Sequence, residues 1–77
     1  MTIERLVAMV NDIAAFFEAE AGPSAPEAVA AHLRRFWAPP MRRQISQAFR
    51  LGDPALAGLS ATARQAISVL AAGSDGQ

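Results

Sequence analysis

Cysteine and lysine are absent from this chain of 77 residues, and histidine occurs once. Without cysteine, the chain has no disulfides, thiolate zinc sites, cysteine nucleophiles or cysteine ligands for iron–sulfur clusters. No apolar run approaches the roughly 20 residues that a bilayer-spanning helix needs, and the N-terminus lacks the basic and apolar segments of a secretory signal. We therefore expect a soluble cytoplasmic chain that holds no cofactor or metal of its own.

Residues that could carry out a reaction are also scarce. His32 lies at the edge of the apolar arc of its expected helix, and no second imidazole or thiolate can join it as a metal ligand. Glu18 and Glu20 are two residues apart, so on a helix they point to different faces and do not form a working pair of carboxylates. No glycine-rich loop resembles a phosphate cradle. The sequence therefore predicts a chain without catalytic, cofactor-binding or metal-binding residues, which is not an enzyme.

What the chain does have is helical periodicity. From about residue 2 to residue 20, apolar residues recur within an arc of roughly 120°, as an amphipathic helix requires. A break at AGPSAP follows, where Ser24 and Glu27 have the spacing of a capping box that starts a second helix. This second helix should end near Trp37, because the two prolines that follow cannot continue it.

Proline is well suited to the first turn of a helix, so a third helix is expected from about Pro40 to Leu51, with Gly52 as its C-terminal cap. After DPALAG, Ser60 is expected to cap a fourth helix that ends near Gly73. The last residues, SDGQ, should form a frayed tail from about residue 73. No internal repeat and no alternation typical of β-strands interrupts this pattern.

The expected fold class is all-α, a small bundle of about four short helices that forms one domain over residues 1–77. Met9 and Phe16 lie outside the main apolar stripe of the first helix and widen its apolar face to roughly half the cylinder, which indicates two neighbours, one of which can be another chain. The core candidates are Leu6, Val10, Ile13, Phe17, Val29, Leu33, Phe36, Ile45, Phe49, Leu59, Ile67 and Leu70.

Positive charge is concentrated in the middle of the chain, although the net charge is zero. Residues 1–27 carry five acids and one arginine, whereas residues 28–52 carry no acid. The five arginines of that second segment, here called the arginine strip, are Arg34, Arg35, Arg42, Arg43 and Arg50. Guanidinium groups form paired hydrogen bonds with carboxylates or phosphates, and arginine and tryptophan are enriched at interface hot spots. Together with Trp37, the strip therefore predicts a binding surface.

Two kinds of partner fit such a surface. Nucleic acid would use the positive charge, and two helices joined by a short turn loosely resemble a helix-turn-helix. However, the double proline is a poor match to a turn that usually contains glycine, lysine is absent, and the sequence pI is near neutral. A protein partner that bears carboxylates is favoured, and a small helical nucleic-acid-binding regulator is the alternative.

Two runs of residues carry a family resemblance: MVNDIAAFF at residues 9–17 and AAHLRRFWAPPMRRQI at residues 30–45. They resemble the small delta subunit of soluble, molybdenum-dependent, NAD-dependent formate dehydrogenases. The resemblance extends from about Ile3 to Leu70, and its most specific part is the combination of M-x-N-x-I-A-x-F-F with H-x-x-x-F-W-x-P-x-M-R. It implies a cytoplasmic accessory subunit of an oxidoreductase complex, without redox centres, that supports assembly or molybdenum-cofactor insertion.

The partner that the resemblance implies is the catalytic alpha subunit, which carries a bis-molybdopterin guanine dinucleotide cofactor and iron–sulfur clusters. Its maturation chaperone is a further candidate, neither nucleic acid nor membrane is expected, and self-association is left open. Core packing is the favoured reading for Phe36 and Met41, and Trp37 is expected as an anchor partly buried in the domain and partly under the partner. The residues expected to contact the partner are Asn11, Phe16, His32, Arg34, Arg35, Trp37, Pro39, Met41, Arg42, Arg43 and Arg50.

Overall fold

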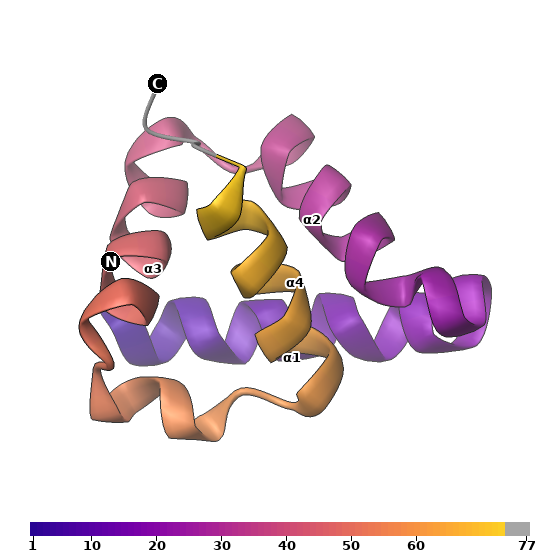
Figure 1. The fold of residues 1–77 in the computed structure, drawn as a ribbon, viewed down its shortest axis with the longest axis horizontal. Helices are drawn as coiled ribbons and strands as arrows, with labels where there is room; N and C mark the ends of the chain where they lie inside the picture. Colours follow the sequence, from indigo (N-terminus) through magenta and orange to yellow (C-terminus); the bar gives the residue numbers. More distant parts are fainter. Residues whose placement is uncertain (74–77) are drawn as a thin grey trace.

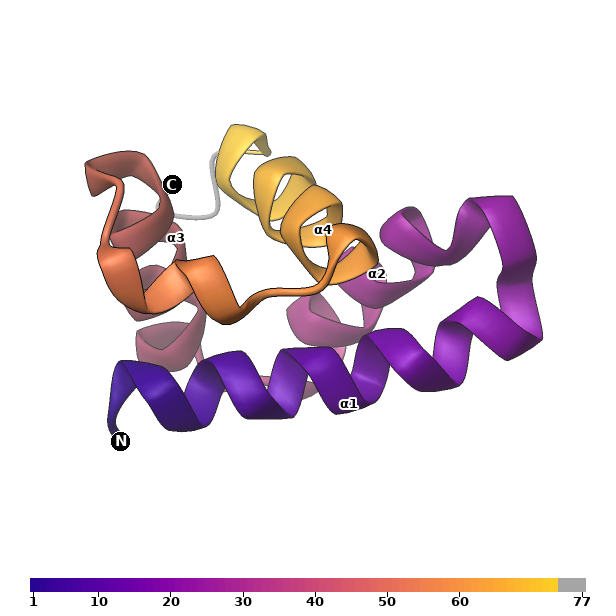
Figure 2. The same cartoon turned by 90° about the horizontal axis from the view of Figure 1, so that it is seen from below.

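A computed structural model describes residues 1–73, and all regular structure within them is helical. The elements in chain order are α1 (Ile3–Ala21), η1 (Gly22–Ser24), α2 (Ala25–Phe36), α3 (Pro39–Leu51), η2 (Pro54–Gly58) and α4 (Ala61–Ala72), where η denotes a 3-10 helix. Helix α4 lies between α2 and α3, and α1 runs across one side of the other helices (Figures 1 and 2). The predicted all-α fold is confirmed, and the expected tail after residue 73 lies outside the described residues.

Side-chain and glycine caps set most of the helix ends. The Thr2 Oγ1 atom accepts a hydrogen bond from the Arg5 N–H at 3.2 Å at the start of α1, and the Ser60 Oγ atom accepts one from Ala63 at the start of α4. Gly52 ends α3 in the left-handed conformation (φ 69°), which a residue without Cβ adopts at little cost. The predicted caps at Ser60 and Gly52 are therefore confirmed.

The predicted capping box at Ser24 does not form. Ser24 precedes α2 but belongs to η1, and its backbone (φ −87°, ψ 5°) is not in the extended conformation that turns an N-cap side chain toward the first helical N–H groups. Its hydroxyl makes no capping hydrogen bond. Pro26 has no N–H, which removes one of the groups that such a cap would satisfy.

The core lies where α4 packs against its neighbours, and it combines a few large side chains with many alanines. Ala14, Ala30, Ala63 and Ala66 are fully buried, and residues this small let the helix backbones approach closely. Of the predicted core residues, Ile13, Phe17 and Phe49 are half-buried against this core, and Phe36 is exposed. The other eight are buried: Leu6, Val10, Val29, Leu33, Ile45, Leu59, Ile67 and Leu70.

The prediction that Phe36 lies in the core is wrong, because its neighbour Trp37 takes the inward position. Helix α2 ends at Phe36, and the Trp37 backbone is extended (φ −84°, ψ 140°), which directs the two adjacent side chains to different sides. Trp37 is only 6% exposed and belongs to the core, whereas Phe36 is 65% exposed. The Trp37 N–H donates to the Leu33 carbonyl at 2.9 Å and closes the last turn of α2.

The double proline ends α2 and starts α3, as the sequence indicates. Ala38 is extended and acts as the N-cap residue of α3, and Pro39 and Pro40 occupy the first two helical positions. Neither position would use an N–H within the helix, so the prolines cost no hydrogen bond. The start of α3 is one residue earlier than expected.

Ser46 gives the first test of this packing. Its side chain is 1% exposed, and within residues 1–73 its Oγ atom has no hydrogen-bond partner. Burying an unpaired hydroxyl is unfavourable, so Ser46→Ala should raise the free energy of unfolding by about 1 kcal/mol. Ser68→Ala, at an exposed position of α4, is the control and should gain only the difference in helix propensity, about 0.5 kcal/mol. Urea denaturation measures both, and a loss of stability in Ser46→Ala would contradict the packing described here.

Candidate interaction surface

The arginine strip does not form one free cationic face, because two of its members bind the end of α4. The last carbonyls of an α-helix have no partner within the helix and carry partial negative charge. Arg50 of α3 donates from Nη2 to the Ala71 carbonyl at 2.9 Å. Arg34 of α2 donates from Nη2, at a longer 3.5 Å, to the Val69 carbonyl, which also accepts from the Gly73 N–H at 3.0 Å. Arginines from both neighbouring helices therefore hold the C-terminal end of α4.

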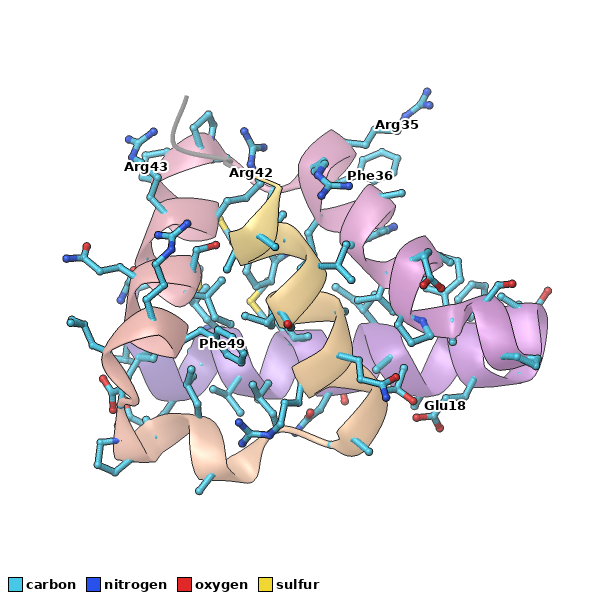
Figure 3. All side chains as sticks on the ribbon, in the orientation of Figure 1. Glu18, Arg35, Phe36, Arg42, Arg43 and Phe49 are labelled. Atoms are coloured by element: carbon cyan, nitrogen blue, oxygen red, sulfur yellow. The ribbon has the colours of Figure 1, made fainter. Side chains whose placement is uncertain are left out.

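Arg42 has a similar role at the end of α2. Its Nη1 atom donates to the Trp37 carbonyl at 2.6 Å and to the Arg34 carbonyl at 3.1 Å. The side chain thus reaches from the first turn of α3 back to the end of α2 (Figure 3). These bonds close the turn that contains the double proline, so Arg42 stabilises the connection between the two helices.

Arg35 and Arg43 remain exposed. Figure 3 shows Arg35 projecting away from the end of α2 and Arg43 projecting away from α3. Neither makes a hydrogen bond or ion pair with another residue of the described range 1–73. The guanidinium carbon of Arg35 lies 5.6 Å from the centre of the Phe36 ring, within the range of a cation–π contact. The strip therefore divides into three arginines that bind backbone carbonyls and two that face outward.

Asn11, another expected contact residue, uses its side-chain amide within the chain. Its Nδ2 group donates to the Gly58 carbonyl at 2.8 Å, and its Oδ1 atom accepts from the Ser60 N–H at 2.9 Å. The amide thereby joins α1 to the last residue of η2 and to the N-cap residue of α4. Among the remaining expected residues, Met41 is half-buried against the core and Pro39 is exposed.

Four aromatic rings from α1 and α2 form a continuous group on the surface. The centre of the Phe17 ring lies 5.0 Å from that of Phe16 and 5.7 Å from that of His32, and His32 lies 4.7 Å from Phe36. Phe16 and Phe36 are 59% and 65% exposed, whereas Phe17 and His32 are half-buried. We call Phe16, Phe17, His32 and Phe36, together with Arg35, the aromatic patch.

Sequence reasoning found part of this patch. The sequence predicts partner contacts for Phe16, His32 and Arg35, but core positions for Phe17 and Phe36. The usable signal was the four-residue spacing of His32 and Phe36, which places two rings on one helix face. Their contact with the rings of α1 depends on how the two helices pack, and the sequence does not show this.

Two further features to consider in the described residues are clustered metal ligands and helices that could span a membrane. Within residues 1–73, no three His, Cys, Asp or Glu side chains are arranged so that they could hold a metal ion. In the same range, no helix is both long and apolar enough to cross a bilayer.

The fold and the surface define a small all-helical protein in which arginines bind helix ends and aromatic rings face outward. Residues 5–67 match the family model described as NADH-dependant formate dehydrogenase delta subunit FdsD. This match spans most of the chain, which therefore belongs to the FdsD family. The family name describes a subunit of a formate dehydrogenase complex. The resemblance seen in the sequence is confirmed. No curated protein and no solved structure gives a significant match.

Replacing Arg50 tests the role of the arginines in the fold. Arg50→Leu removes the donor to the Ala71 carbonyl and a positive charge near the C-terminal end of α4, and should lower the free energy of unfolding by about 1 kcal/mol. Arg43→Leu is the matched control, because Arg43 lies on the same helix without such a bond, and it should change stability by less than about 0.5 kcal/mol. Equal effects of the two substitutions in urea denaturation would show that the carbonyl contact of Arg50 contributes nothing.

Asn11→Asp tests the bridge between α1 and the start of α4. A carboxylate still accepts from Ser60 but cannot donate to the Gly58 carbonyl, so the variant should lose about 1–2 kcal/mol of unfolding free energy. Asp12→Asn, the reverse change at the exposed neighbouring position, should have little effect. Thermal unfolding followed by circular dichroism compares them, and a neutral Asn11→Asp variant would show that the bond to the Gly58 carbonyl does not stabilise the fold.

Proposed function

We propose that this chain is a non-catalytic subunit that docks on the catalytic subunit of a formate dehydrogenase complex and supports its assembly or the insertion of its molybdenum cofactor. Membership in the delta-subunit family carries this proposal. The family description names NADH, a cofactor of cytoplasmic metabolism, which supports a cytoplasmic location. The maturation chaperone of the catalytic subunit is included as a transient partner during cofactor insertion.

The environment of His32 supports a role without catalysis. The imidazole is half-buried, with the Phe17 ring centre at 5.7 Å and the Phe36 ring centre at 4.7 Å. It is thus part of an aromatic contact between α1 and α2. These contacts support a packing role for His32.

The hydrogen bonds of the arginine strip favour a protein partner over nucleic acid. A nucleic-acid-binding surface gains affinity by placing several cationic side chains against phosphates. Arg34, Arg42 and Arg50 instead donate to backbone carbonyls of this chain, which leaves Arg35 and Arg43 as the outward-facing members of the strip. Two guanidinium groups suit local pairing with carboxylates better than tracking a phosphate backbone.

Production of the complex with and without this chain tests the proposal. The tagged chain should co-purify with the catalytic subunit, and deletion of the chain should lower the yield of assembled complex or the molybdenum bound per catalytic subunit. Size-exclusion chromatography and metal analysis by mass spectrometry measure these quantities. Full assembly and normal molybdenum content without the chain, together with no co-purification, would contradict the proposal. Reintroducing the chain on a plasmid is the control for the deletion.

A further inference from the structure

We infer that the aromatic patch, rather than the arginine strip as a whole, is the surface that docks on the catalytic subunit. The inference rests on the proposed function, because it names the docking surface of the same subunit. It assigns the contact to Phe16, Phe36 and Arg35, with Phe17 and His32 supporting the two outer rings. The other role, stabilising the helix ends of this chain, then belongs to Arg34, Arg42 and Arg50.

The exposed rings have no evident role in folding the isolated chain. Phe16 and Phe36 are 59% and 65% exposed, and neither belongs to the buried core or to the half-buried residues that pack against it. A phenylalanine side chain offers roughly 150–250 Å² of surface, so these two leave on the order of 200 Å² of ring in water. Phe16 and Phe36 are linked through the rings of Phe17 and His32, and exposed rings grouped in this way are typical of a surface that a protein partner covers.

Ring-to-ring contacts hold the two exposed side chains in place. Phe16 meets Phe17 edge to face, with an interplanar angle of 82°, and Phe36 packs against His32. Phe17 in turn packs against the core, which ties the patch to the domain. Side chains that are ordered before binding lose little conformational freedom on docking, so the patch can bind through only a few rings.

Arg35 indicates that the partner surface carries a negatively charged group. Its guanidinium lies over the Phe36 ring, and it makes no hydrogen bond to another described residue. Because residues 28–52 contain no acid, neither the rest of α2 after Glu27 nor α3 offers a carboxylate to it. The complementary surface on the catalytic subunit should therefore combine an apolar cleft for the two phenylalanines with a carboxylate at its edge, which would form charge-assisted hydrogen bonds with Arg35.

The size of the chain agrees with a single docking face centred on the patch. A standard interface buries about 800 Å² on each partner, against a total accessible surface of 4414 Å² for this chain. The rings and Arg35 would supply the central anchors, and the adjoining exposed faces of α1 and α2 the surrounding contacts.

The test compares matched variants of the tagged chain, each produced with the other subunits of the complex. The Phe16→Ser and Phe36→Ser double variant should weaken binding of the catalytic subunit on the order of 100-fold, and Arg35→Glu should also weaken it. The controls are Leu51→Ser, an apolar residue 75% exposed on α3, and Arg43→Glu, the other outward-facing arginine of the strip. Both controls should bind like the wild-type chain. The readout is the catalytic subunit recovered per tagged chain, followed by titration of purified partners.

Each outcome decides between two surfaces or two partners. Wild-type binding by the double variant and by Arg35→Glu would overturn the patch, and loss of binding only in Arg43→Glu would assign docking to the arginine strip. If the tagged wild-type chain does not co-purify with the catalytic subunit, the proposed function itself is contradicted. A free wild-type chain that is dimeric, and that becomes monomeric in the double variant, would assign the patch to a second copy. Circular dichroism checks folding, and Arg35→Glu keeps the test decisive if the double variant unfolds.

Discussion

The carbonyl groups at the C-terminal ends of α2 and α4 accept hydrogen bonds from arginine side chains of neighbouring helices, and these bonds join α2, α3 and α4 at their ends. A domain of 77 residues buries a limited core, so bonds between its elements carry particular weight. Arginine suits this role because its planar guanidinium presents several donors: Arg42 reaches two carbonyls at once. Arg64 binds the Leu56 carbonyl of η2 in a comparable way, at 2.6 Å.

This use of arginine also determines what the surface offers to a partner. At the end of α2, Arg34 and Trp37 are directed to the domain, whereas Arg35 and Phe36 point outward. One short segment therefore supports the fold and contributes to the aromatic patch. All five arginines of residues 28–52 keep their charge, but the carbonyl contacts of Arg34, Arg42 and Arg50 restrict where these three guanidinium groups lie.

Much of the fold could be predicted because its signals are local: apolar periodicity, the double proline, the Ser60 cap and the Gly52 cap. The errors arose where the outcome depended on backbone conformation or on packing. Ser24 does not cap α2, because it lies in a 3-10 turn. The prediction for Phe36 is wrong because α2 ends at this residue, and the extended backbone of the next residue turns the Trp37 side chain into the core instead. The acceptors of the arginines are backbone carbonyls, which no sequence pattern reveals. The candidate surface was therefore predicted only in part, through Phe16, His32 and Arg35.

The most direct test of this account is the rotation and hydrogen exchange of each guanidinium group, measured by NMR on the labelled chain. Arg42 and Arg50, which make the shorter carbonyl contacts, should show restricted rotation and slowly exchanging Nη hydrogens. Arg35 and Arg43 should show the averaged signals of freely rotating groups. Equally averaged signals for all four arginines would contradict the claim that arginine–carbonyl bonds hold the helix ends.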